Sequence, residues 1–242
     1  MTASGTPLGV GSFADLTPTR PHVWALDVTT TWFDALADSD VVSEEERARA
    51  EALSDPSASR RLLARRSALR MVICRYVGQQ PEEIRIVTAP GGKPVLVPTG
   101  LHRCRVTFAT AHSGDFYCVA VGTAASLGLD VERLRHVPRA RAIAVRWFGS
   151  AETEILSATS DEAVAAAFMR LWTAKEALAK RHGAGLRLMM GRDEIELDVE
   201  AAANEGRLRA ISVAPGYAAA IASTEVIVDV DVTRPGDDSW IT

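Results

Sequence analysis

Two stretches of equal length, RLLARRSALRMVICRYVG at residues 61–78 and AAFMRLWTAKEALAKRHG at residues 166–183, decide the expected fold. Each has the spacing of an amphipathic helix and ends in glycine, and each follows a shorter helix expected to open at a serine, Ser43 or Ser150. Three aligned pairs match in character: Leu63 with Phe168, Arg65 with Arg170, and Arg75 with Lys180. This repetition predicts two related halves that meet near residues 112–116.

Helix and strand patterns come in clusters along the chain, which predicts an α+β fold rather than a doubly wound sheet. Helices are expected from Ser43 to Leu53, Ala58 to Tyr76, Ser150 onward and Asp161 to His182. Strands are expected at Ile84–Thr88, Val95–Val97, Arg105–Ala109, Tyr117–Val121, Leu127–Glu132, Glu194–Leu197, Arg207–Val213, Tyr217–Ala222 and Glu225–Val230. The predicted organisation is a loose lead-in at residues 1–20, an N-terminal half at 21–114, a C-terminal half at 115–231 and a tail at 232–242.

The composition is that of a soluble globular protein of 242 residues, with 47% hydrophobic and 24% charged residues. A formal net charge of −4 argues against general nucleic-acid binding. No stretch approaches the roughly 20 apolar residues of a membrane span, and no secretion signal is evident. The three cysteines form no CxxC pair, which argues against a disulfide framework or a zinc site and favours a reducing, cytoplasmic environment.

Asp130 and Glu132 are two residues apart on an expected strand, so both side chains point to the same face. Two neighbouring carboxylates are unfavourable unless a cation compensates their charge. Mg²⁺ fits this requirement, since it takes carboxylate oxygens together with water and phosphate. The plainer alternative is a solvent-exposed end of a strand.

Glu176 and Lys180 are four residues apart on an expected helix and share a face with Trp172. In isolation, this pair is read as an ordinary helix salt bridge worth about 0.3–0.5 kcal/mol. Beside the carboxylates of the strand, it also suits a site for a metal ion and a phosphate ester.

Positive charge is concentrated on the first long helix. Its arginines are Arg60, Arg61, Arg65, Arg66, Arg70 and Arg75. Arginines gathered at one helix start suit phosphate groups, although a solvated helix face is the plainer reading. Lys93 follows two glycines in a turn, and His112 stands at the end of an expected strand. A plain turn and a structural histidine are the alternatives for these two residues.

Read in order, these motifs carry a resemblance to a known family. The chain shows the arginine-rich helix, Gly-Lys-Pro, Phe-x-x-x-His-Ser, Gly-Leu-Asp-Val-Glu, Trp-Thr-Ala-Lys-Glu-Ala-x-x-Lys and Gly-x-Gly-Leu. Over roughly residues 43–186 the chain resembles a 4′-phosphopantetheinyl transferase of the surfactin-synthetase-activating type. One departure is Ala111, where the family often has serine, so that a hydroxyl contact to the nucleotide is missing.

The resemblance implies two similar α/β halves related by a pseudo-twofold axis, with coenzyme A bound between them. It implies an enzyme, a holo-[acyl-carrier-protein] synthase, that moves the 4′-phosphopantetheine group from coenzyme A to a serine of an apo acyl or peptidyl carrier protein. Fatty-acid, polyketide and nonribosomal-peptide carriers remain open. A monomer is expected, with neither nucleic acid nor membrane as a partner.

The resemblance also implies roles for individual residues. Mg²⁺ would be held by Asp130, Glu132 and Glu176. Lys180 would reach the pyrophosphate and stabilise the leaving group, and Glu176, directly or through a metal-bound water, would be the base for the carrier serine. The 3′-phosphate end of coenzyme A would be held by Lys93, His112, Arg61, Arg66 and Arg60.

Two other functions use the same residues. One is a Mg²⁺-dependent hydrolase of the coenzyme A pyrophosphate, which needs no carrier protein. The other is a non-catalytic module that binds a carrier protein or a nucleotide. The three carboxylates and Lys180 argue against the second.

Overall fold

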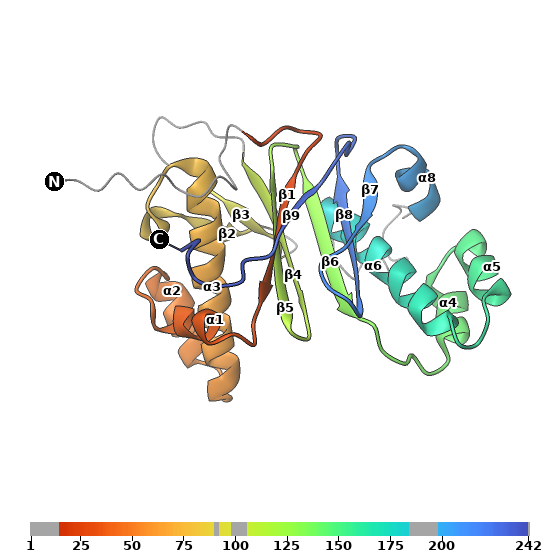
Figure 1. Cartoon of the computed structure of the whole chain (residues 1–242), viewed down its shortest axis with the longest axis horizontal. Helices are drawn as coiled ribbons and strands as arrows, with labels where there is room; N and C mark the ends of the chain where they lie inside the picture. Colours follow the sequence, from red (N-terminus) through yellow and green to blue (C-terminus); the bar gives the residue numbers. More distant parts are fainter. Residues whose placement is uncertain (1–14, 90–91, 98–105, 184–197, 242) are drawn as a thin grey trace.

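The computed structural model describes residues 15–89, 92–97, 106–183 and 198–241. Several expectations lie outside these ranges: most of the lead-in, Gly91, Arg105, the strand at 194–197, and the Gly-Leu end of the Gly-x-Gly-Leu motif. The described chain is a mixed α+β fold, as predicted, with helices on both outer sides of a central group of strands (Figure 1).

The N-terminal sheet has the strand order β4-β5-β1-β9. It consists of β1 (His22–Asp27), β4 (Thr107–Ser113), β5 (Phe116–Gly122) and β9 (Asp231–Thr233). Strand β1 is antiparallel to β5 and parallel to β9. The last strand of the chain therefore returns to the N-terminal sheet.

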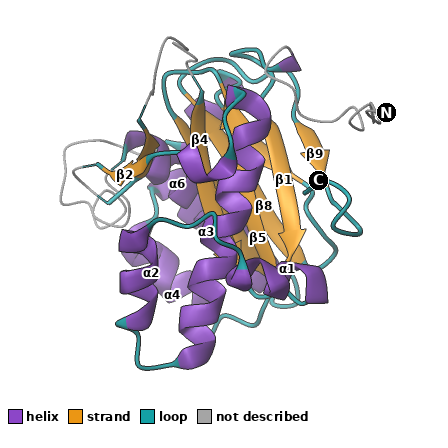
Figure 2. Cartoon of the chain, turned by 90° about the vertical axis from the view of Figure 1, so that its left-hand side faces the viewer, coloured by secondary structure: helices purple, strands orange, loops and turns teal. Residues whose placement is uncertain are grey.

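The long helix α3 (Pro56–Val77) covers one face of this sheet. Figure 2 shows it crossing in front of the strands, with two short helices beside it, α1 (Thr31–Ala35) and α2 (Glu44–Glu51). The remaining short elements of this side are the 3-10 turns η2 (Leu36–Asp38) and η3 (Pro81–Glu83) and the hairpin β2 (Ile86–Thr88) and β3 (Pro94–Leu96).

The C-terminal sheet has the strand order β6-β8-β7, and the pairing is antiparallel throughout. It consists of β6 (Leu127–Arg133), β7 (Leu208–Ile211) and β8 (Tyr217–Ser223), with the long helix α6 (Val164–His182) packed on it. Further helices are α4 (Ala140–Trp147), α5 (Ser150–Ala158) and α8 (Val199–Asn204). A long helix packed on a sheet thus occurs twice, with α3 on the N-terminal sheet and α6 on the C-terminal sheet.

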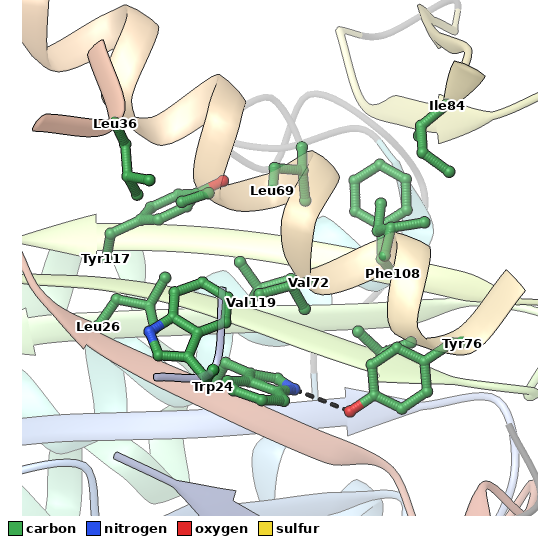
Figure 3. Packing of buried hydrophobic residues seen from close by; sticks show 14 of the residues in the cluster. Trp24, Leu26, Leu36, Leu69, Val72, Tyr76, Ile84, Phe108, Tyr117 and Val119 are labelled. Carbon is green, nitrogen blue, oxygen red and sulfur yellow. Dashed lines mark hydrogen bonds between the residues drawn. The ribbon is translucent and has the colours of Figure 1, made fainter. Parts of the chain in front are cut away.

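Side chains along each strand alternate between the two faces of the sheet, which divides the apolar core into layers. On β1, Trp24 and Leu26 pack in the cluster under α3, whereas Val23 and Ala25 pack between the two sheets. Figure 3 shows the first of these layers, where the indole Nε1 of Trp24 donates a 2.8 Å hydrogen bond to the hydroxyl of Tyr76 on α3. The order of layers is therefore helix, sheet, sheet, helix.

Both short helices with a serine start form as predicted. Ser43 and Glu46 make the reciprocal capping box of α2, and α5 begins at Ser150. Helix α3 begins two residues earlier than expected, because Asp55 caps it and Pro56 takes the first helical position.

Other boundaries were predicted wrongly. Asp161 does not cap α6, which begins at Val164; its carboxylate instead accepts a hydrogen bond from Arg141 at 2.7 Å. The expected strand at 225–230 does not form, and β9 follows it. The expected tail is partly packed, since Trp240 is buried against Trp24.

Within the residues that the structure describes, none of the helices combines the length and the apolar character needed to cross a membrane.

Candidate active site

Gly128 on β6 lets the backbone of α6 come unusually close to the C-terminal sheet. A Cβ atom at this position would lie 1.9 Å from the carbonyl oxygen of Ala177 and 2.5 Å from the amide nitrogen of Arg181. Only glycine fits between a strand and a helix at this separation. The close approach brings residues of β6 within reach of side chains on α6.

Three carboxylates meet where β6 faces α6. Leu129 and Val131 point into the core between the sheets, so Asp130 and Glu132 point to the opposite face. Glu176 of α6 completes the group, and each of the three acids offers an oxygen within 4.8 Å of the others. The geometry brings these acids together from two elements that are far apart in the sequence.

Lys180 lies one helical turn beyond Glu176 and forms an ion pair within this carboxylate cluster. Its Nζ is 2.6 Å from Oδ1 of Asp130 and 4.0 Å from Oε2 of Glu176. One ammonium facing three carboxylates leaves two formal negative charges when all three acids are ionised. A divalent cation would balance that excess.

Asp130 gives the clearest indication that this cluster suits a bound cation. It is buried, and its Oδ2 makes no hydrogen bond to the described residues. Burial raises the pKa of its carboxyl well above the usual value; Lys180 lowers that pKa, and Glu176 and Glu132 raise it further. A bound cation would favour the charged form. Hard carboxylate oxygens and an unpaired buried oxygen therefore fit a divalent cation such as Mg²⁺.

A cavity of about 190 Å³ adjoins this cluster. It is lined by the turn that carries Lys93, by Phe108 and Thr110 of β4, and by Lys180 at the end of α6. The cavity thus has walls from both halves of the chain and a cationic side chain on each of two walls.

Lys93 is held in place by the C-terminal half. Its Nζ donates hydrogen bonds to the carbonyl oxygen of Leu127 at 2.7 Å and to Oγ of Ser126 at 2.9 Å. Burial lowers its pKa. An ammonium has three donors, so one remains to contact an anion in the cavity.

His112 is exposed on β4 and lies within electrostatic reach of cationic side chains. Partial burial of its ring lowers the pKa of the imidazole, and the positive charges of Arg65 and Lys180 lower that pKa further. Arg65 was not among the arginines predicted to bind phosphate. Its charge acts on His112, and the sequence signal for it was only its place among six arginines.

Arg60, on α3, forms ion pairs with two carboxylates. Its Nε is 2.9 Å from Oδ1 of Asp34, and its NH2 is 2.7 Å from Oδ2 of Asp38. Because two carboxylates of α1 and η2 engage its guanidinium, Arg60 is less available to a phosphate than Arg61 or Arg66. Arg61, by contrast, is exposed, and its ion-pair contact within the described residues is a long one of 3.5 Å to Asp55.

The other arginines of α3 also differ in how closely other groups engage their guanidinium. Arg66 has a loose contact of 3.7 Å to Glu46. Arg70 is buried and pairs with the same carboxylate at 2.9 Å. Arg75 donates to the carbonyl oxygen of Trp240 at 2.7 Å. The last two therefore have structural partners, whereas Nε of Arg65 donates a 3.1 Å hydrogen bond to the carbonyl oxygen of Arg61.

Ala111 is buried in the apolar cluster between the sheets, with 4% of its surface exposed. A serine hydroxyl there would be placed among apolar side chains. The hydroxyl contact expected from the resemblance therefore has no support in this packing.

Comparison with known proteins agrees with this site. The model of the 4′-phosphopantetheinyl transferase superfamily matches residues 126–221, which include all three carboxylates and Lys180. The chain is 32% identical over 182 residues to the 4′-phosphopantetheinyl transferase HetI of Nostoc sp., a match covering 73% of each protein.

Two further relatives show the range of similarity. A protein of Synechocystis sp., named as a candidate 4′-phosphopantetheinyl transferase, is 33% identical over 146 residues, which is 60% of this chain and 58% of the relative. The 4′-phosphopantetheinyl transferase Sfp of Bacillus subtilis is 24% identical over 202 residues, covering 79% of this chain and 86% of Sfp. The surfactin-synthetase-activating subtype thus has only distant support.

Proposed function

The chain belongs to the 4′-phosphopantetheinyl transferase superfamily, a family of enzymes, and from this premise we propose that it transfers 4′-phosphopantetheine from coenzyme A to a serine of an apo acyl or peptidyl carrier protein. The observation that carries the proposal is the meeting of Asp130, Glu132 and Glu176 within 4.8 Å, beside Lys180. Such a cluster suits the transfer of a phosphoryl group, in which negative charge must be neutralised.

In the proposed reaction, the carrier serine oxygen attacks the phosphorus that bears the pantetheine arm. A new P–O bond forms, the bond to adenosine 3′,5′-bisphosphate breaks, and the proton of the serine passes to a carboxylate oxygen of Glu176. Lys180 donates hydrogen bonds to the departing phosphate. Mg²⁺ held by Asp130, Glu132 and Glu176 would neutralise the pyrophosphate and the charge developing on the leaving group.

The nucleotide end of coenzyme A is proposed to lie along β4 and the start of α3. Lys93 and His112 are proposed to contact the 3′-phosphate, together with the arginines whose guanidinium groups are least engaged. These are Arg61, Arg65 and Arg66. Support comes from the location of Lys93 at the cavity wall and from the charge of Arg65 beside His112.

One type of incubation, repeated with a fatty-acid, a polyketide and a nonribosomal-peptide carrier protein, tests the proposed activity. The protein is mixed with coenzyme A, Mg²⁺ and an apo carrier protein, and the products are read by intact mass and by chromatography of the nucleotide. Transfer adds one phosphopantetheine group to the carrier and releases adenosine 3′,5′-bisphosphate in equal amount. Release of that nucleotide without modification of any of the three carrier classes would favour the hydrolase, and no product would favour a binding module.

The proposal extends to a cytoplasmic, monomeric enzyme. Cys74 and Cys118 are free thiols, which fits a reducing compartment.

Arg65→Ala is expected to raise the KM for coenzyme A about 10-fold, because a hydrogen bond to a charged group is lost. The value of kcat should fall less, since the 3′-phosphate is remote from the reacting phosphorus and its binding is largely uniform. Arg61→Ala should also raise KM and should make it less sensitive to salt. Steady-state kinetics at two salt concentrations measure both effects.

Arg60→Ala is the matched comparison for these variants. Its guanidinium is engaged by Asp34 and Asp38, so it should leave the KM for coenzyme A unchanged. If Arg60→Ala raised this KM more than Arg65→Ala, the assignment of the arginines would be reversed. If only the KM for the carrier protein changed, the arginines would bind the protein partner instead.

A further inference from the structure

Ser113, at the end of β4, connects the N-terminal half to the carboxylate cluster of the C-terminal half. Its Oγ donates a 2.8 Å hydrogen bond to Oε2 of Glu132. The same oxygen accepts a 3.1 Å hydrogen bond from the backbone amide of Arg133. Ser113 therefore contacts the side chain of one cluster residue and the backbone of the next residue on β6.

The chemistry of the partners fixes the direction of both hydrogen bonds. A backbone amide only donates, and an ionised carboxylate only accepts. Because the amide of Arg133 occupies a lone pair of Oγ, the single hydroxyl hydrogen of Ser113 is left for Glu132. The hydroxyl of Ser113 thus donates to the Glu132 carboxylate and orients it.

The turn that follows Ser113 is anchored by a separate set of contacts. The hydroxyl of Tyr217 on β8 accepts a 2.9 Å hydrogen bond from the amide of Asp115. The ring of Tyr217 packs edge-on against Phe116, with the ring centroids 5.0 Å apart. Gly114 has a φ of +53°, and a Cβ there would lie 2.6 Å from the Tyr217 hydroxyl oxygen. This anchoring keeps Ser113 in place without help from its own side chain.

We propose that Ser113 is a positioning residue, which holds Glu132 in the orientation that a divalent cation requires and makes the metal site depend on a strand of the other half. The inference rests on the proposed function, in which Asp130, Glu132 and Glu176 bind that cation. Partners that orient a metal ligand typically change metal affinity about 10–100-fold when they are removed. His112 precedes Ser113 on β4, so one strand contributes both to the proposed nucleotide contact and to the metal site.

The test measures metal binding rather than turnover. Mn²⁺ is titrated into the full-length protein at saturating coenzyme A, and free Mn²⁺ is followed by electron paramagnetic resonance, with coenzyme A alone subtracted. Ser113→Ala should weaken Mn²⁺ binding about 10-fold with little change in thermal unfolding. Ser113→Thr keeps the hydroxyl and should restore the affinity. Ser157→Ala, which removes an exposed hydroxyl on α5, should match the unaltered protein.

Asp130→Ala separates this inference from the proposed function. If the unaltered protein binds Mn²⁺ more tightly than Asp130→Ala, the carboxylate cluster is the metal site. Equal Mn²⁺ binding by Ser113→Ala would then overturn the role of Ser113 alone, and so would a Ser113→Thr variant as weak as Ser113→Ala. If the unaltered protein and Asp130→Ala bind Mn²⁺ equally, the proposed metal site fails, and the inference fails with it.

Discussion

Replacing Asp130 or Glu176 with alanine is expected to lower the rate of phosphopantetheine transfer by about 10²–10³-fold, the range seen when one preorganised electrostatic group is removed from an active site. Each change removes one of three carboxylates that meet within 4.8 Å. Without that carboxylate the remaining acids and Lys180 no longer provide the arrangement that we propose for Mg²⁺.

Both variants should remain folded, and for Asp130 the structure gives a physical reason. Asp130 is buried, and burial and the two neighbouring acids raise the pKa of its carboxyl. The charged form is therefore unfavourable without a cation, so removing it takes away repulsion along with the ion pair to Lys180. Thermal unfolding without metal should change little.

The measurement is the initial rate of carrier modification beside a thermal unfolding curve for each variant. Glu154→Ala is a suitable control, because it removes an exposed carboxylate on α5, outside the cluster. A folded Asp130→Ala variant with near-normal transfer would show that the cluster has no role in the reaction.

Gly128→Ala should have the second large effect, and it should act on both stability and transfer. The added Cβ would lie 1.9 Å from the carbonyl oxygen of Ala177, a backbone atom that cannot move without moving α6. Overpacking of this kind costs about 1–3 kcal/mol, and the upper end is expected here. For a chain of this size, about 3 kcal/mol lowers Tm by about 6–12 °C.

Transfer should fall in the same variant at temperatures where it is still folded. Helix α6 carries Glu176 and Lys180, so displacing it moves both groups away from Asp130. Gly236→Ala provides the control, since a Cβ at that position meets nothing within 4 Å. An unchanged Tm for Gly128→Ala would contradict the close approach of β6 and α6.

Local sequence patterns predicted much of the secondary structure because the relevant interactions span only a few residues. The capping box of Ser43 and Glu46 is one such interaction, and the glycine ends of α3 and α6 are others. Strand β1 escaped prediction for a physical reason. It lies between β5 and β9 with both faces covered, so its residues do not alternate between apolar and polar.

The sequence also predicted which residues of the site share a face. Spacing of two on a strand placed Asp130 beside Glu132, and spacing of four on a helix placed Glu176 beside Lys180. Periodicity is a property of one element, so these pairs needed no knowledge of the rest of the chain. The meeting of the two pairs was implied only by resemblance to a family.

Tertiary structure alone decided which of several similar side chains face a ligand. Six arginines on α3 look alike in sequence, yet Arg60 is engaged by acids of α1 and η2, whereas Arg75 reaches Trp240, 165 residues away. Ser113 likewise acquires its contact with Glu132 only when β4 and β6 are packed together. Helical and strand periods fix relative directions within an element, but the absolute direction depends on contacts with distant segments. Those contacts are set by the packing of the two sheets and the two long helices.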